Sequence, residues 1–162
     1  MKYDLGEDVI KALRESADVL VLIGFNRLLK GHVLDACKHG VLSTHPSNTF
    51  EKRGRPDTFF EWISENKTLT YTLQRLNNSV DGGEVITQEK VDISSAKSLS
   101  EAKWLVRTVR PKLYVPALTK LEDGEKIFPV PGSKSVLTRS RDRDRIRNVL
   151  KYLRVSLKKR YR

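Results

Sequence analysis

The sequence predicts an α/β domain followed by a basic amphipathic helix, and three observations support this fold class. Helix-like and strand-like segments alternate along the first half of the chain, as they do in α/β domains. A length of 162 residues, 38% of them hydrophobic and 31% charged, suits one globular domain. The last part of the chain is strongly basic, and its apolar residues recur at helical spacing.

Two helix–strand units are predicted in the first part of the chain. Segment 7–16 has apolar residues on one helical face and acidic residues in its first turn, which predicts a short helix. Segment 19–25 is a continuous apolar run, typical of a parallel strand covered on both faces. A short helix over 31–40, closed by Gly40, and a second strand over 41–46 follow.

The middle of the chain predicts a short helix and a pair of antiparallel strands. A polar loop over 47–56 precedes a helix over 57–66, for which Asp57 is the expected N-cap. Segments 68–76 and 84–93 alternate apolar and polar residues on either side of a turn cluster.

A long helix is predicted over 98–124. It starts with the capping-box spacing from Ser98 to Glu101. Pro111 and Pro116 are expected to bend or break it, because a proline inside a helix removes a backbone hydrogen bond.

The net charge of +11 is concentrated at the C-terminal end. Segment 133–162 holds 12 of the 31 Lys and Arg residues and only two acids, whereas 1–132 has a net charge of +1. We divide the chain into a body over 1–126, a linker over 127–140 and a basic amphipathic helix over 141–162. The apolar residues of this helix are Ile146, Val149, Leu150, Leu153 and Leu157.

Three roles are open for the basic helix. It could cap the body with its basic side in water, bind an RNA backbone, or bind an anionic membrane surface. Tyr152 and Tyr161 would be available to stack on bases.

Several classes of protein are excluded by composition. A single cysteine, Cys37, allows no intrachain disulfide, and together with three scattered histidines it matches no zinc spacing. No apolar run approaches the ~20 residues of a membrane helix, and the first twenty residues do not form a secretory signal. A cytoplasmic protein is therefore expected. Phosphate-binding fingerprints are absent, since the PGSKS segment at 131–135 lacks the spacing of a P-loop.

Five segments, taken in order and spacing, resemble the formyltransferase family, which includes glycinamide ribonucleotide, methionyl-tRNA and amino-sugar formyltransferases. The resemblance covers about residues 5–125 and implies the C-terminal half of a Rossmann-like mixed sheet with flanking helices. Family members transfer a formyl group from 10-formyltetrahydrofolate to an amine. The five segments are GFNRLL (24–29), GVLSTHPS (40–47), RGR (53–55), VDGGEVITQE (80–89) and LSEA (99–102).

The resemblance implies a catalytic site made of His45, Asp81 and Ser43. The histidine and the aspartate match the family's residues, but Ser43 stands where the family has an asparagine. Attack of an amine on a formyl group creates a negative oxygen that a fixed donor stabilises, and a serine hydroxyl has a shorter reach than a carboxamide. Without the resemblance, His45 would be a structural hydrogen-bond partner, Asp81 a tight-turn residue and Ser43 a small residue in a strand.

The resemblance also implies a folate pocket and a loop that faces the acceptor. Arg53 and Arg55 belong to that loop, although alone they would be ordinary solvated charges. The residues expected to line the folate pocket are Asn26, Arg27, Leu28, Leu29 and Val80.

Three functions are compatible with these features: a formyltransferase or part of one, an inactive remnant of the same fold that binds RNA or protein, and an assembly module. Full family members have further strands before the segment that matches 19–25. Without those strands, segment 19–25 would have a bare edge. Because a bare apolar strand edge promotes aggregation, we expect another chain to cover it, in a homo-oligomer or a complex.

Overall fold

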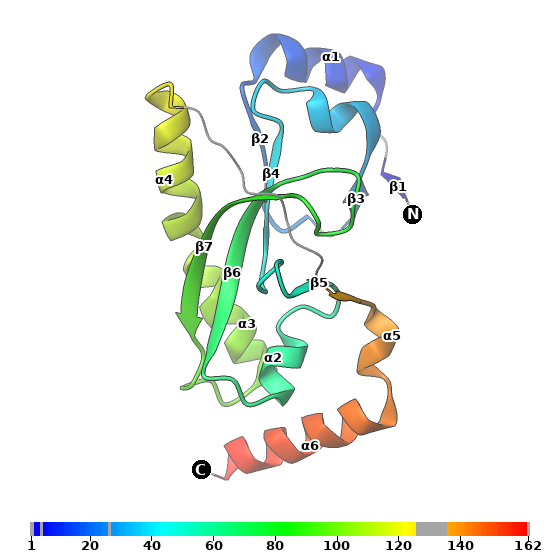
Figure 1. Cartoon of the computed structure of the whole chain (residues 1–162), viewed down its shortest axis with the longest axis vertical. Helices are drawn as coiled ribbons and strands as arrows, with labels where there is room; N and C mark the ends of the chain where they lie inside the picture. Colours follow the sequence, from blue (N-terminus) through cyan, green and yellow to red (C-terminus); the bar gives the residue numbers. More distant parts are fainter. Residues whose placement is uncertain (1, 4, 26, 126–135, 162) are drawn as a thin grey trace.

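A four-stranded mixed sheet in the order β2–β4–β6–β7 lies at the centre of the computed structural model (Figure 1). β2 (Leu20–Leu22) runs parallel to β4 (Val41–His45), and β6 (Thr68–Arg75) and β7 (Glu84–Asp92) continue the sheet in antiparallel fashion. The predicted α/β class with a mixed sheet is therefore confirmed. The structure describes residues 2–3, 5–25, 27–125 and 136–161.

A small layer of structure packs beside β2 and β4. It contains α1 (Glu7–Ser16), the short parallel pair of β1 (Lys2–Tyr3) with β3 (Leu28–Leu29), and a 3-10 helix, η1 (Gly31–Asp35). Only the 31–35 part of the helix predicted over 31–40 is helical, and in the tighter form. The side chains of this layer bury one of the two apolar clusters, which includes Ile10, Leu29, Val33, Leu34 and Val41.

The larger apolar cluster fills the space between the sheet and the helices α2 (Phe59–Ile63), α3 (Leu99–Thr108) and α4 (Arg110–Glu122). The predicted break of the long helix occurs at Val109, and Pro111 lies in the first turn of α4, where a missing N–H costs nothing. Ser98 caps α3 as predicted, because its side chain accepts from the Glu101 N–H at 3.1 Å.

The expected N-cap role of Asp57 is wrong. The residue before α2 is Thr58, whose backbone is left-handed with φ 64°, and its side chain makes no capping bond. Asp57 instead pairs with Lys103 of α3 at 3.2 Å. A carboxylate can interact either with a helix N-terminus or with a cation on a neighbouring helix. Asp57 makes the second of these interactions.

β2 is shorter than the predicted strand and lies at an edge of the sheet. Its two faces do pack on different clusters, with Val21 toward the larger one and Leu20 and Leu22 toward the smaller. All three residues are only half-buried, and the next residue, Ile23, is 66% exposed. Within the described residues, β4 is the one strand that pairs with β2.

The C-terminal segment is attached to the body at two places. β8 (Val136–Thr138), within the predicted linker, pairs in parallel with β5 (Lys52–Gly54) from the loop before α2. The short α5 (Ser140–Arg143) leads to α6 (Ile146–Arg160), which packs beside α2 (Figure 1). The rest of the predicted linker, at 127–135, lies outside the described residues. Of the helices that the structure describes, none is long and apolar enough to cross a bilayer.

We predict that Gly54→Ala separates β8 from β5. Gly54 has φ +86°, and a Cβ at this residue would lie 2.2 Å from the Thr138 carbonyl oxygen, so the two backbones could not keep their spacing. The expected loss of stability is about 1–3 kcal/mol. It should be accompanied by faster hydrogen exchange at the amides of 136–138.

Gly31→Ala is the matched control, because Gly31 has a similar φ of +78° but no atom within 4 Å of the added Cβ. Equal protection of 136–138 in wild type and Gly54→Ala would show that the close approach is unimportant.

Candidate functional site

Two adjoining cavities open where β2 and β4 end. Loops that follow the carboxyl ends of parallel strands in an open sheet form the usual binding crevice of α/β proteins. The larger cavity has a volume of about 230 Å³ and the smaller about 130 Å³. Both are lined by residues of β2, β4 and the loops beyond them, including Leu22, Phe25, Ser43, Thr44 and Arg55.

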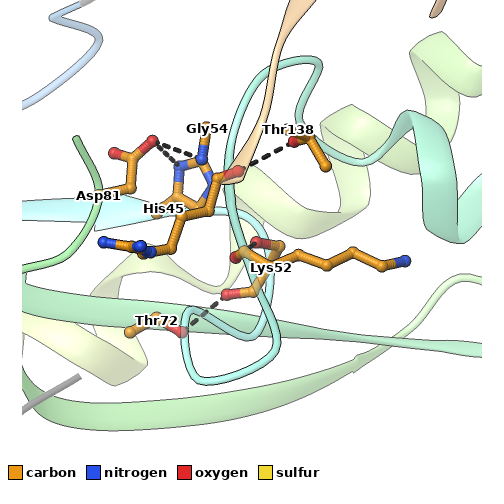
Figure 2. Close-up of polar contacts among 8 residues, drawn as sticks. His45, Lys52, Gly54, Thr72, Asp81 and Thr138 are labelled. Carbon is orange, nitrogen blue, oxygen red and sulfur yellow. Dashed lines mark hydrogen bonds and ion pairs between the residues drawn. The ribbon is translucent and has the colours of Figure 1, made fainter. Parts of the chain in front are cut away.

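His45 and Asp81 lie together at the larger cavity. The His45 Nδ1 is 3.5 Å from the Asp81 Oδ2, and the same carboxylate oxygen accepts a hydrogen bond from the Gly54 N–H at 3.0 Å (Figure 2). His45 is 7% exposed and Asp81 half-buried. A carboxylate held by a backbone donor fixes the orientation of an imidazole that contacts it. An imidazole and a carboxylate in this arrangement can accept and release protons at the cavity wall.

The position of Asp81 depends on its turn. Its backbone has φ 45°, a left-handed conformation that aspartate tolerates better than most residues. Asn77 stabilises this turn, because its Nδ2 donates to the Gly82 carbonyl at 2.9 Å and its Oδ1 accepts from the Ser79 N–H at 2.8 Å.

Ser43 lies on β4 two residues before His45, so both side chains belong to the same face of the strand. It is half-buried and lines both cavities. Its hydroxyl is the group available at the position where the resembling family has a carboxamide.

The residues expected to bind folate are brought together where the structure describes them. Arg27, Leu28, Leu29 and Val80 line the larger cavity, with Phe25 beside them. Asn26 lies outside the described residues. The wall is therefore largely apolar on the β3 side and carries His45 and Asp81 on the other.

The two arginines expected to face the acceptor differ in position. Arg55 is exposed and lines both cavities. Arg53 lines neither of these two cavities; its guanidinium lies against Gly82, where a Cβ would come within 2.4 Å of its Nη1. The Arg53 carbonyl accepts from the Thr138 hydroxyl at 2.9 Å (Figure 2), so this residue joins the site loop to β8.

A cationic wall of the smaller cavity was not predicted from the sequence. Lys103, Arg107 and Arg110 line it together with Arg55. Lys103 and Arg107 lie four residues apart on one face of α3, and Arg110, three residues further on, is the first residue of α4. That spacing was visible in the sequence and could have indicated an anion-binding surface.

A chain of hydroxyl groups lies between the cationic wall and β4. The Arg110 Nε donates to the Tyr71 oxygen at 2.9 Å, and Tyr71 and Thr44 share a hydrogen bond of 2.8 Å. Tyr114 donates to the Leu22 carbonyl at 3.1 Å. Burial raises the pKa of the Tyr114 phenol, although the nearby Thr44 hydroxyl and Arg110 charge act to lower it. Tyr114 therefore remains a proton donor at neutral pH.

Among the described residues, no group of three or more His, Cys, Asp or Glu side chains could hold a metal ion. The polar groups that the described residues bring to these cavities include His45 with Asp81, hydroxyl groups and cations.

Comparison with known proteins gives consistent matches. A model of the formyl transferase family matches residues 4–118. The methionyl-tRNA formyltransferase of Rickettsia bellii is 26% identical over 122 residues, which is 75% of this chain and 39% of the relative. That of Bacillus subtilis is also 26% identical, over 142 residues, which is 82% of this chain and 45% of the relative. The chain thus spans less than half the length of these curated relatives.

Solved structures show the same fold. The formyltransferase PseJ from Anoxybacillus kamchatkensis, solved with a UDP-linked formamido sugar and tetrahydrofolate, has a TM-score of 0.72 at 17% identity; the match covers 93% of this chain and 78% of that one. HypX from Aquifex aeolicus, solved with tetrahydrofolic acid, has a TM-score of 0.65 at 17% identity, with 94% and 28% covered.

We predict that Asp81→Ala and Asp81→Asn separate the two roles of this carboxylate. Alanine leaves the buried Gly54 N–H without an acceptor, which should cost about 1–3 kcal/mol of unfolding free energy. Asparagine keeps an acceptor oxygen and should cost clearly less, while it removes the negative charge beside His45. Chemical denaturation of the three proteins measures this order. Equal losses would mean that the Gly54 contact does not depend on the side-chain oxygen.

Proposed function

The chain belongs to the formyl transferase family, and from this membership we propose that it contributes the catalytic part of an enzyme that formylates an amine with 10-formyltetrahydrofolate. The observation that carries the proposal is the His45–Asp81 pair on the wall of the cavity lined by Arg27, Leu28 and Leu29. In this reaction the amine nitrogen bonds to the formyl carbon, the bond from that carbon to the folate nitrogen breaks, and a proton passes from the amine to the folate nitrogen.

His45 is the group proposed to handle that proton. An imidazole can accept a proton from the attacking amine and return one to the leaving nitrogen near neutral pH. Asp81 acts as its positioning residue, since it contacts Nδ1 and leaves the other ring nitrogen for the reacting groups. Its negative charge also stabilises the imidazolium that forms during the transfer.

Ser43 is proposed to donate to the oxygen that becomes negative when the amine attacks. A single donor of this kind is worth about 10²-fold or more in rate. The hydroxyl lies on the same strand face as His45 but reaches less far than a carboxamide. Its contribution to the rate should therefore be smaller than that of the asparagine found at this position in the family.

The folate is proposed to lie in the larger cavity. Two solved structures with this fold, PseJ and HypX, contain tetrahydrofolate or tetrahydrofolic acid. Leu28, Leu29 and Val80 give an apolar wall on which a pterin ring can pack, and Arg27 adds a charge suited to the glutamate carboxylates of a folate.

The amine acceptor is proposed to carry phosphate. Arg55, Lys103, Arg107 and Arg110 concentrate positive charge around the smaller cavity, where only Asp57 opposes them among its lining residues. An amino-sugar nucleotide and methionyl-tRNA both meet this description. The nucleotide sugar in the PseJ structure and the names of the curated relatives support one acceptor each.

We predict that His45→Ala abolishes formyl transfer while leaving folate binding nearly unchanged. The imidazole carries the proton, whereas the apolar wall provides most of the folate contact. With an acceptor small enough not to be obstructed by the larger side chain, Ser43→Asn should raise the rate by about 10-fold or more, because it places a carboxamide donor in the same direction. A transfer assay with an amino-sugar nucleotide and with methionyl-tRNA measures the rates of both variants. Calorimetry with a folate analogue measures folate binding by His45→Ala.

The transfer assay and the calorimetry must use the same protein samples. Equal turnover in wild type and His45→Ala would refute the role of the histidine. The absence of folate binding to folded wild type would refute the folate cavity itself.

We also propose that a second chain covers the free edge of β2, in a homo-oligomer or a complex. Support comes from the half-burial of Leu20, Val21 and Leu22 at a sheet edge and from the exposed Ile23 beside them. An apolar edge strand has unpaired backbone donors and acceptors that another chain can use.

Light scattering of wild type should therefore give a mass above 18.6 kDa, and Ile23→Lys should shift the population toward the monomer. A charge at this position would be buried in any interface formed along the edge. Leu150→Lys is the matched control, because Leu150 has similar exposure but lies on α6, at the other end of the molecule. A wild-type monomer that unfolds cooperatively would contradict the proposal.

A further inference from the structure

The face of α6 that points away from the body is apolar. Five aliphatic side chains on this face are between 40% and 78% exposed, and we call them the α6 stripe. Scattered exposed apolar residues are normal on protein surfaces, but a contiguous row marks an interaction site. The members of the α6 stripe are Ile146, Val149, Leu150, Leu153 and Leu157.

The α6 stripe is held outward because a different face of the helix docks on the body. Tyr152 stacks on Phe59 with ring centres 5.9 Å apart, and the Lys159 ammonium lies 4.3 Å from the centre of the Trp62 ring. Val155, on the same side, is buried. The docked residues lie almost opposite the stripe around the helix, so rotation of α6 to bury the stripe would break these contacts.

One flank of the α6 stripe is cationic. Arg147, Lys151, Arg154 and Lys158 recur at spacings of four and three residues, and α6 contains no acidic residue. Lys158 is the one member of this flank with a recorded ion pair among the described residues, with Glu65. The other three residues, Arg147, Lys151 and Arg154, are exposed beside the aliphatic side chains.

The cationic flank continues into a cavity between α6 and the body. This cavity has a volume of about 580 Å³, and Phe60 and Ile63 contribute apolar wall. Four cations line it: Lys52, Arg145, Arg147 and Lys151. Lys52 pairs with Glu61 at 3.8 Å and Arg145 with the lining residue Asp142 at 3.2 Å, whereas Arg147 and Lys151 are exposed. A cavity of this kind suits a phosphate-bearing head group attached to an apolar tail.

We propose that α6 docks the protein on an anionic phospholipid surface. The α6 stripe enters the boundary between head groups and acyl chains, and the cationic flank contacts lipid phosphates. Helices that combine an apolar face with lysine and arginine bind in the plane of such surfaces. At 15 residues, α6 is too short to span a bilayer but long enough to lie on one.

Charge and geometry favour a lipid surface over other occupants. RNA would pair with the cations but would leave the aliphatic stripe in water. A second copy joined through the stripe would bring two cationic flanks together with no acid on either helix. A protein groove that wraps a helix needs more of its circumference than the docked α6 presents. A flat anionic surface needs only the outward face.

This attachment would leave the functional cavities accessible. α6 lies at the opposite end of the molecule from α1, and β3, whose residues line the larger cavity, lies nearer to α1 than to α6 (Figure 1). Lipid binding can therefore be tested without reference to the proposed transfer reaction.

Vesicle flotation tests the proposal on the full chain. Wild type should float with phosphatidylcholine/phosphatidylglycerol vesicles and not with phosphatidylcholine alone, and added salt should weaken the binding because it screens exposed charges. Each cation removed should lower the affinity about fivefold. The triple variant Arg147→Glu/Lys151→Glu/Arg154→Glu and the double variant Leu150→Asn/Leu153→Asn should both lose binding, since charge and apolar contact are each required.

Two matched controls should float like wild type. Lys38→Glu/Lys90→Glu/Lys120→Glu makes the same charge change at exposed positions elsewhere. Trp104→Asn/Val115→Asn removes two similarly exposed apolar side chains from α3 and α4. Circular dichroism and thermal unfolding establish that every variant is folded, which the exposure of the replaced residues favours.

Three results would overturn the proposal. One is equal flotation of wild type and Leu150→Asn/Leu153→Asn. Another is the absence of wild-type flotation combined with filter binding to single-stranded RNA that is lost only in the charge-reversed variant. The third is a fall in mass by light scattering in Leu150→Asn/Leu153→Asn, which would identify the stripe as a contact between copies.

Discussion

The carboxylate of Asp81 joins the segments on which the rest of the site depends. It contacts His45 at the end of β4 and accepts the Gly54 N–H of β5. β5 in turn pairs with β8, through which the chain continues to α6. A single oxygen thus links the central sheet, the loop before α2 and the C-terminal segment. Because Gly54 is buried, no water can easily replace this acceptor, which makes the contact a structural requirement in addition to the chemical role proposed for Asp81.

Local sequence patterns predicted the helices and strands that pack on the body through the apolar face their sequence shows. The alternation over 68–76 and 84–93 gives β6 and β7, and the predicted long helix breaks just before Pro111. Pro116, which was also expected to bend or break that helix, lies inside α4. The meeting of His45 with Asp81 was expected from the family resemblance, and placement at the end of a parallel strand explains it. Elements decided by tertiary contacts were predicted less well. Asp57 contacts Lys103 rather than capping its helix, and α6 docks through aromatic and cation–π contacts rather than through its apolar stripe.

The cationic wall could not be predicted from the net charge of the chain. The body of the chain has a nearly neutral balance, so its total charge gave no sign of an anion site. The fold brings Arg55, Lys103, Arg107 and Arg110 to one cavity, while the acids of the body lie mostly elsewhere. Local concentration of charge, and not the sum, determines the field at a site. The excess charge of the C-terminal segment lies on a separate surface, so the two cationic regions can have different ligands.

Ser43 shows how one substitution can have opposite consequences in a site of this shape. The side chain lines both the larger and the smaller cavity, so its small size leaves open the space through which the two adjoin. A carboxamide at this position would bring a stronger donor to the reacting oxygen but would also occupy part of that space. In the proposed reaction, the effect that prevails depends on the bulk of the acceptor, which is proposed to approach from the cationic side. A compact amine would be formylated faster because of the donor, whereas a bulky one would lose access. The change in transfer rate that Ser43→Asn causes with different acceptors therefore reports the size of the group that the site holds.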